Sequence, residues 1–319
     1  MGHVVRCLNL SKNLTNCNIS FLIEDYGGIK KFLQEHRIKK IFTIKPNISL
    51  LVDLKETEKI IREEKIDVLI IDKYDLKQNY CKKIKKCVKV VVLSDLFNLD
   101  FPADLVINGF IGFKNGVQEN KYGVQCLVGP KFQILNNDFR KKKRIKKNYD
   151  LLVTVGGFDE KNIIGKFLKV VSDFPKPIKT KVILGPATIK TKKINKLEKI
   201  CKNNAIIKSQ TSNMFSEINS SKFGLCSGGI TTYEFASMKV PFAIICQVKH
   251  QMLTAKEWEK RNIAINLGLV NKKSETKIEE LLDKIVNNEY SFVKSEKIVD
   301  GFGAIRVSRV IRKMLEKLN

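Results

Sequence analysis

The stretch DLLVTVGGFD, residues 150–159, joins an apolar, β-branched run to a pair of glycines. We predict a strand over residues 150–155 and a turn at Gly156 and Gly157, because glycine lets the backbone turn sharply and approach a ligand closely. Ligands of open parallel sheets bind beyond the carboxyl ends of the strands. The stretch therefore predicts a βα unit with a binding site at its end.

The same alternation of short apolar runs with charged amphipathic stretches extends along all 319 residues. It is typical of βα units that form a parallel sheet, so we predict the α/β fold class. We expect a helix over residues 54–64. The expected strands are residues 19–24, 40–44, 67–71, 89–93, 105–108, 150–155, 179–184, 205–208, 223–226, 241–246 and 263–267.

The chain is long enough for two domains of roughly 150 residues each. A basic run with almost no apolar side chains, RKKKRIKK, occupies residues 140–147. We interpret residues 140–149 as a linker between a first domain, 1–139, and a second, 150–319, with a nuclear-localisation or RNA-binding run as the alternative. In this division the last helix of the second domain can pack against the first domain.

The net charge, the length of the apolar runs and the cysteine pattern exclude several classes of function. The net charge of +26 favours an anionic partner, but the lysines are spread over every predicted helix, so we interpret them as a solvated surface and expect no nucleic-acid partner. No run approaches the roughly 20 apolar residues of a membrane span. The eight cysteines form no CxxC pair and the start shows no signal-peptide pattern, so we expect reduced thiols and a cytoplasmic protein.

A second glycine pair lies in CSGGITTYE, residues 226–234, at the end of a predicted strand. Gly228-Gly229 would let the backbone approach a ligand, and the N–H groups that follow, at Thr231-Thr232, favour a phosphate there. Glu234, one turn into the predicted helix, could accept hydrogen bonds from two ribose hydroxyls. The alternative for the glycine pair is a simple tight turn.

Polar residues also follow the predicted strand 241–246, where His250 and Gln251 would lie at the same edge. The chain has three histidines, so few side chains could act as a base at neutral pH. We interpret His36 as helix surface, and His3 as a base candidate or a capping residue. The absence of HExxH and of paired cysteines at zinc spacing predicts no metal site.

A first helix is indicated by the apolar stripe Leu8, Leu10 and Leu14, with Gly2 in the position of a phosphate-loop glycine. No strand precedes this turn in the sequence. Either the fold begins with a helix, or the true start lies upstream and a strand is missing.

Several segments together resemble one family. They are GHVVRCL (2–8), IIDKY (70–74), VGPKF (128–132), VGGFD (155–159), GGITTYE (228–234) and DGFGA (300–304). In this order they resemble the UDP-2,4-diacetamido-2,4,6-trideoxy-β-L-altropyranose hydrolases of pseudaminic acid biosynthesis and the related spore-coat polysaccharide proteins. The second half is also similar to the nucleotide-binding domain of the lipid-linked UDP-N-acetylglucosamine transferases. This implies the GT-B architecture, two Rossmann-like domains with parallel sheets facing a central cleft, here without the first strand.

The resemblance implies hydrolysis of a UDP-sugar to UDP and a free diacetamido sugar, without a cofactor. It places His3 as the residue that activates water, and Tyr74 on the tyrosine of the family's Asp-His-Tyr turn, in which Lys73 replaces the histidine. It places Gly2 and Arg6 against the substrate. A UDP-sugar transferase and a non-catalytic UDP-sugar-binding homologue are the alternatives; an amphipathic membrane-facing patch in the first half, which we do not detect, would favour the transferase.

The resemblance also implies a substrate site in the second half. The diphosphate would lie at Gly228, Gly229 and Thr231, the ribose at Glu234 and the sugar edge at Gln251. The remaining residues that we expect to line this site are Gly156, Gly157, Thr232 and His250.

Overall fold

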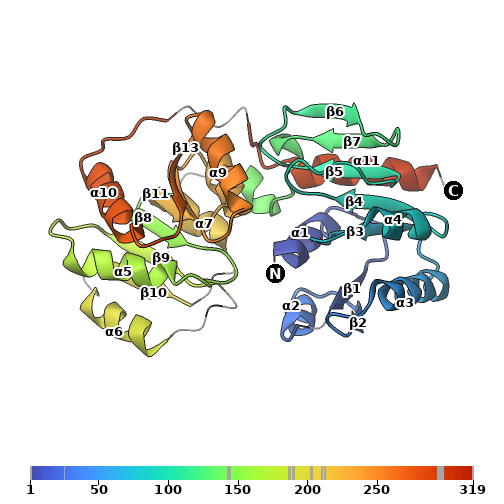
Figure 1. The fold of residues 1–319 in the computed structure, drawn as a ribbon, viewed down its shortest axis with the longest axis horizontal. Helices are drawn as coiled ribbons and strands as arrows, with labels where there is room; N and C mark the ends of the chain where they lie inside the picture. Colours follow the sequence, from blue (N-terminus) through green and yellow to red (C-terminus); the bar gives the residue numbers. More distant parts are fainter. Residues whose placement is uncertain are drawn as a thin grey trace. The chain divides into compact units, whose positions relative to one another are not determined.

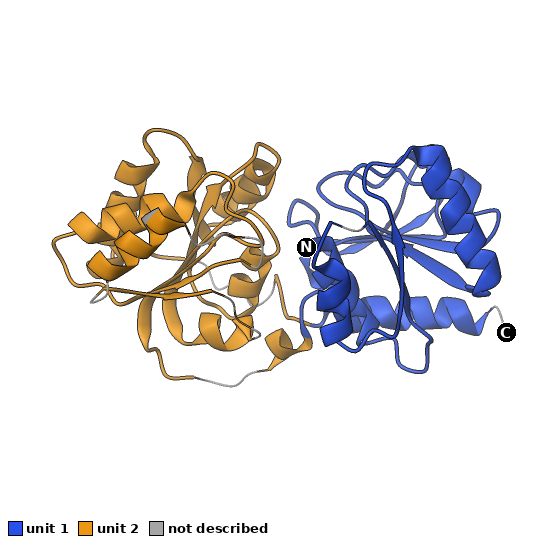
Figure 2. Ribbon diagram, turned by 90° about the horizontal axis from the view of Figure 1, so that it is seen from below, with its two compact units in different colours: residues 1–136, 302–319 blue, residues 137–301 orange. Residues whose placement is uncertain are grey.

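The computed structural model divides the chain into two units, which Figure 2 shows in different colours. Unit 1 comprises residues 1–136 and 302–319, and unit 2 comprises residues 137–301. The structure describes residues 2–24, 26–141, 145–185, 188, 191–201, 204–209, 211, 213–292 and 298–317. Three residues of the predicted linker, 142–144, lie outside the described residues.

Unit 1 alternates helices and strands from α1 to β4, and β5, β6 and β7 then follow with no helix between them in the described residues (Figure 1). Its helices are α1 (Gly2–Ser11), α2 (Ile29–Glu35), α3 (Leu50–Glu63), α4 (Gln78–Ile84), the 3₁₀ helix η1 (Pro130–Phe132) and α11 (Gly303–Glu316). Its strands are β1 (Ser20–Glu24), β2 (Lys40–Ile44), β3 (Val68–Ile71), β4 (Lys89–Leu93), β5 (Leu105–Asn108), β6 (Gly116–Glu119) and β7 (Gln125–Val128).

These strands form two sheets. β1 and β2 pair in parallel as one sheet, and the other has the order β3-β4-β5-β7-β6, in which only the β6–β7 pair is antiparallel. The central strands are buried on both faces, as Val90, Val91 and Val92 of β4 show, because helices cover both sides of the sheet. α3 and α4 pack on the face that includes Val90 and Val92.

The other face of this sheet is covered by α1 and α11, the first and last helices of the chain. Leu10 of α1 and Val307 and Ile311 of α11 share one core with Val91. Leu8 of α1 packs in a separate core with residues of β1 and α2. The first helix therefore contacts both sheets of unit 1.

Unit 2 has one sheet with the order β10-β9-β8-β11-β12-β13, in which all pairs are parallel. Its strands are β8 (Tyr149–Thr154), β9 (Thr180–Ile183), β10 (Ala205–Lys208), β11 (Ser221–Cys226), β12 (Phe242–Cys246) and β13 (Ala264–Leu269). Its helices are η2 (Asn137–Arg140), α5 (Ile163–Asp173), α6 (Lys192–Ile200), α7 (Met214–Asn219), α8 (Thr231–Ser237), α9 (Gln251–Lys260) and α10 (Ser274–Val286).

Two separate apolar clusters cover the faces of this sheet. α5, α6 and α10 pack against one face, in a core that includes Phe167, Phe223 and Leu282. Aromatic side chains of α8, α9 and β12 meet elsewhere, where Trp258 is fully buried and its ring lies 5.8 Å from that of Phe242. Unit 2 therefore has its own core.

The structure confirms the predicted α/β class, and each predicted strand is present to within a few residues. The expectation of wholly parallel sheets is wrong for β6, which forms an antiparallel hairpin with β7. The prediction missed both strands of this hairpin. β6 is short and exposed, β7 has only four residues, and their pairing depends on the turn with Gly123 (φ +67°) and Asn120, whose side chain accepts from the N–H of Val124. None of the helices in the described ranges is long and apolar enough to span a membrane.

Candidate functional site

The two predicted glycine turns of unit 2 follow neighbouring strands. β8 and β11 pair with Thr154 opposite Cys226, so Gly156 and Gly228 leave the sheet at the same edge. Gly156 has a φ of +87°, which favours glycine. From β8 the chain adds strands first on one side, β9 and β10, and then on the other, β11 to β13. The turns therefore lie at a topological switch point, where open α/β sheets bind ligands.

Side chains tie the two turns together. The Ser227 hydroxyl donates to the carbonyl oxygen of Val155 at 2.9 Å. Nε2 of the buried Gln247, just after β12, donates to the carbonyl oxygens of Val155 at 3.1 Å and of Phe158 at 2.9 Å. Two carbonyl acceptors fix the orientation of this amide. Its Oε1 is buried and has no hydrogen-bond donor among the described residues.

The glycines of the second turn have different surroundings. A Cβ atom on Gly228 would lie 2.8 Å from the carbonyl oxygen and 2.9 Å from the Cβ of Gln251, so this glycine allows α9 to pack on the turn. A Cβ atom on Gly229 would meet no atom within 4 Å. Gly229 therefore borders open space, which is where a ligand could approach the backbone.

Three polar residues lie at the start of α8. Thr232 supports the turn through its hydrogen bonds, and Thr231 and Glu234 are the two that could contact a ligand. The fully buried Thr232 donates to the carbonyl oxygen of Gly229 at 2.8 Å and accepts from Trp258 Nε1 at 3.0 Å, so its hydroxyl holds the turn. Burial raises the pKa of the Glu234 carboxyl to about 7, and a hydrogen bond with Thr231 opposes part of this rise. Glu234 can thus gain or lose a proton near neutral pH.

The remaining predicted residues of unit 2 lie at the start of α9. His250 is exposed and occupies the position before the helix without a capping hydrogen bond from its side chain, whereas Gln251 is the first residue of the helix. Gln251 Oε1 accepts a hydrogen bond of 2.8 Å from the backbone N–H of Gln247. The structure thus brings Gln251 against Gly228 and Gln247 at one edge of the unit 2 sheet.

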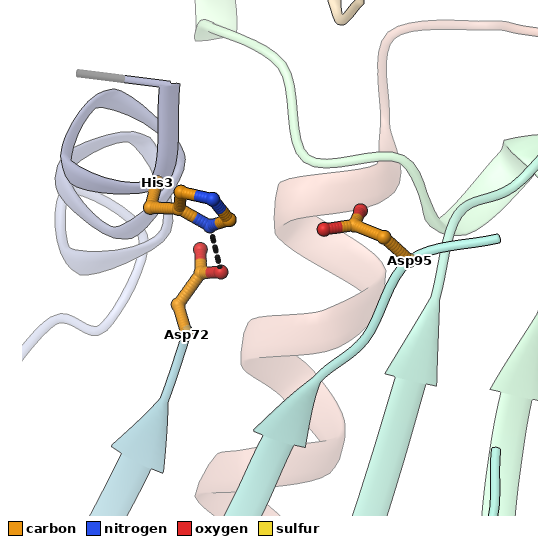
Figure 3. Close-up of side chains that lie close together, drawn as sticks. All are labelled: His3, Asp72 and Asp95. Carbon is orange, nitrogen blue, oxygen red and sulfur yellow. Dashed lines mark hydrogen bonds and ion pairs between the residues drawn. The ribbon is translucent and has the colours of Figure 1, made fainter. Parts of the chain in front are cut away.

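In unit 1, His3 lies in the first turn of α1 and Asp72 directly follows β3 (Figure 3). His3 Nδ1 is 2.5 Å from Asp72 Oδ1. The His3 side chain is 41% exposed and that of Asp72 only 2%, so the pair has a buried side and a side open to solvent. Gly2 is the first residue of α1.

Arg6 lies three residues after His3, so both side chains lie on the same side of α1. Its guanidinium makes two hydrogen bonds to the Asp72 carboxylate, from Nε at 2.7 Å and from Nη2 at 2.5 Å. It makes two more to Asp95, which follows β4, at 2.6 and 3.0 Å. Arg6 is buried and faces two carboxylates, so we propose that it organises the site rather than binds substrate.

These charges determine the state of Asp72. Burial alone would raise the pKa of the Asp72 carboxyl, but hydrogen bonds from Arg6 and His3 outweigh burial and lower it. Oxygen and nitrogen atoms of His3, Asp72 and Asp95 lie within 4.8 Å of one another, close enough for a metal ion. Both carboxylates already bond to the Arg6 cation, so we assign no metal here.

Lys73 and Tyr74, the two residues that follow Asp72, have different surroundings from it. Lys73 Nζ bonds to Asp53 of α3 at 2.7 Å and lies 3.3 Å from Glu24 of β1. Burial would lower the pKa of Lys73, but these two carboxylates raise it, so the side chain is a cation. Tyr74 is 74% exposed in the turn after β3. Lys73 therefore links the two sheets of unit 1, and Tyr74 stays accessible.

Comparisons of the sequence with known proteins identify relatives of this chain. No protein-family model matches it. It is 29% identical to the spore coat polysaccharide biosynthesis protein SpsG of Bacillus subtilis, over 99% of this chain and 95% of that protein. It is 30% identical to the UDP-2,4-diacetamido-2,4,6-trideoxy-β-L-altropyranose hydrolase of Campylobacter jejuni, over 61% of this chain and 72% of the hydrolase. The chain belongs to this hydrolase family.

Among solved structures, MurG of Acinetobacter baumannii is similar over 98% of this chain and 96% of that protein, with a TM-score of 0.70 and 15% identity. This likeness confirms the predicted GT-B fold. The resemblance to the hydrolase family seen in the sequence is confirmed too.

Three residues that the structure places at the ends of strands were not selected from the sequence of this member of the hydrolase family. Asp72 was visible only as part of the IIDKY segment, although an acidic residue directly after a buried strand is itself a signal. Asp95 and Gln247 also follow the ends of strands, β4 and β12. Nothing in the local sequence indicates that Arg6 contacts both aspartates.

Proposed function

We propose that this protein is a UDP-sugar hydrolase that releases UDP and a free diacetamido-trideoxy sugar in nonulosonic (pseudaminic) acid biosynthesis. The observation that carries the proposal is the contact between His3 and Asp72 at the carboxyl edge of the unit 1 sheet. A neutral histidine beside a carboxylate can accept a proton from water. The name of the C. jejuni relative, a hydrolase of a UDP-linked sugar, supports the substrate class.

In the proposed reaction a water oxygen forms a bond to the anomeric carbon or to the β-phosphorus, while the C–O or P–O bond at the bridging oxygen breaks. His3 accepts the proton of the attacking water. Both routes yield UDP and the free sugar. Reaction in water labelled with ¹⁸O separates them, because C–O cleavage puts the label in the sugar and P–O cleavage puts it in UDP.

Unit 2 would bind the nucleotide. The open space at Gly229 and the turn that Gly228 allows support a diphosphate there, and the carboxyl of Glu234 supports contacts with the ribose. Gln251 would contact the sugar edge. Thr231, Gly156, Gly157 and His250 complete the proposed binding residues, whereas Thr232 would support the turn from within.

The test is UDP release from purified protein incubated with UDP-linked diacetamido sugars. We expect His3→Ala to lower the rate by roughly 10²–10⁴-fold, the usual effect of losing a general base, and to leave the affinity for UDP unchanged. His36→Ala is the matched control, because His36 is exposed at the end of α2. A His3→Ala protein as fast as the parent would contradict the base assignment, and His250 would be tested next.

A UDP-sugar transferase is the second candidate, and one feature of unit 1 favours it. A groove of about 590 Å³ is lined by Arg306, Arg309 and Arg312 of α11 and by apolar residues such as Val117 and Phe132. Cationic and apolar side chains together suit an acceptor with a phosphate and a hydrocarbon chain. Sugar transfer to a lipid phosphate, with UDP release that requires the lipid, would support this candidate; binding of UDP-sugar without release would indicate a non-catalytic homologue.

A further inference from the structure

Asp72 lies between two basic side chains of α1. Its Oδ1 is 2.5 Å from His3 Nδ1 and 2.5 Å from Arg6 Nη2, and its Oδ2 accepts from Arg6 Nε at 2.7 Å. The Cys7 thiol also donates to Oδ2, at 3.7 Å. With a side chain only 2% exposed, Asp72 is satisfied by these protein donors rather than by water.

Two groups compete for the Nδ1 atom of His3. Arg6 Nη2, 3.4 Å away, can only donate, which requires an Nδ1 without a proton. The Asp72 carboxylate, 2.5 Å away, can only accept, which requires an Nδ1 with a proton. A short hydrogen bond to a charged acceptor is stronger than a long contact to a donor that already has other partners. The geometry therefore favours the proton on Nδ1 and the lone pair on Nε2.

Arg6 holds the Asp72 carboxylate in place. Its side chain is 7% exposed, and it bonds to Asp72 on one side and to Asp95 on the other. Rotation of Asp72 would break two charge-assisted hydrogen bonds in a buried setting, which costs several times more than the same change at the surface. Hydrogen bonds from Arg6 and His3 also keep the pKa of Asp72 low, so the acceptor stays ionised at neutral pH.

We propose that Asp72 is a positioning residue that holds His3 in the Nδ1-protonated tautomer, which makes Nε2 the atom that accepts a proton from water. The charged groups that face His3 are Asp72 after β3, Arg6 of α1 and Asp95 after β4. The catalytic part of this inference rests on the proposed hydrolase function. The tautomer can be measured without any substrate.

The first experiment is nitrogen NMR of the imidazole rings in uniformly ¹⁵N-labelled full-length protein. The chain has three histidines, so His36→Gln and His250→Gln assign the signals of His3. At a pH where His3 is neutral, we expect a protonated Nδ1 and an unprotonated Nε2 in the parent, and loss of this preference in Asp72→Asn. A parent His3 with its proton on Nε2, or a tautomer unchanged in Asp72→Asn, would overturn the proposal.

The second experiment is the kinetics of Asp72→Asn. We expect kcat to fall by about 10²–10⁴-fold with the affinity for UDP unchanged, because the wrong tautomer presents a donor to the water. The acid limb of the pH profile of kcat/KM should change in this variant, because a neutral amide replaces the carboxylate that contacts the imidazole. A merely structural role would lower stability without moving this limb.

Asp104→Asn is the matched control. Asp104 is a largely buried aspartate at the opposite edge of the same sheet, and its carboxylate accepts from the N–H of Val90 at 2.8 Å. We expect this variant to keep the parent kcat and pH profile. If the parent hydrolyses no UDP-sugar, the proposed function fails while NMR still tests Asp72. If the parent is active and Asp72→Asn is equally active, only the positioning role fails.

Discussion

The proposed contact between Glu234 and the ribose would make nucleotide affinity depend on the charge of this side chain. Because burial raises the pKa of its carboxyl to about 7, the free protein holds a mixture of the two forms at neutral pH. The ionised form accepts hydrogen bonds from the two ribose hydroxyls with two charged oxygens, whereas the protonated form turns one of its oxygens into a donor. Binding of a nucleotide should therefore favour loss of this proton.

We predict that the affinity for UDP rises by about tenfold between pH 6 and pH 8, and that binding releases a proton from Glu234. Titration calorimetry in buffers of different ionisation enthalpy measures both effects. Glu234→Gln should weaken binding by about 1–3 kcal/mol and remove this proton release, while the titration of the UDP phosphate itself persists in the variant. Equal proton release by parent and variant would argue against contact between Glu234 and the ribose.

Residue by residue, the sequence allows candidates to be named but not their partners. His3 and Glu234 are predictable because a histidine can act as a base at neutral pH and an acidic residue one turn after a glycine turn can bind a ribose, and the family resemblance places both in these roles. The Arg6–Asp72 contact joins residues 66 positions apart, and only the packing of α1 on the sheet brings them together. The contacts of the buried Gln247 amide cannot be predicted from the sequence either, because its acceptors are backbone carbonyls.

At the scale of the element, the two glycines of the turn between β11 and α8 differ in what surrounds them. Gly228 is where α9 approaches, whereas Gly229 borders open space. We predict that Gly228→Ala lowers the free energy of unfolding by about 1–3 kcal/mol, because the new methyl group displaces α9. Gly229→Ala should change stability by less than about 0.5 kcal/mol and still weaken UDP binding.

Chemical denaturation and UDP titration of both variants check this prediction. A Gly229→Ala protein with parent affinity would show that the diphosphate does not pass over this residue. A Gly228→Ala protein of parent stability would show that α9 can move away at little cost.

Most strands could be predicted from the sequence, but β6 and β7 could not. Strands covered on both faces are apolar throughout, so the short VVV run of residues 90–92, made of β-branched side chains, favours a strand. β6 lies at the edge of its sheet, and most of its side chains are exposed, so no apolar pattern marks it. Its pairing depends on the hairpin turn at Gly123 instead.

At the scale of the whole molecule, unit 2 has a core of its own, which includes Phe167 and Phe223 and whose members among the described residues all lie within 137–301. We predict that a fragment of residues 137–301 unfolds cooperatively and binds UDP with nearly the affinity of the full chain. Thermal unfolding and titration calorimetry of the fragment test this. A fragment that folds without binding UDP would mean that the proposed nucleotide site needs residues of unit 1.

The packing of α11 also determines when each unit can fold during synthesis. Val307 and Ile311 complete the core that α1 shares with β4, yet the ribosome makes them only after the whole of unit 2. At 5–20 residues per second, synthesis of residues 137–301 delays the last helix of unit 1 by on the order of 10 s, so the described core residues of unit 2 are all made before that helix. We therefore expect unit 2 to complete its core before unit 1 does, and the half-covered sheet of unit 1 to be the surface that a chaperone meets during synthesis.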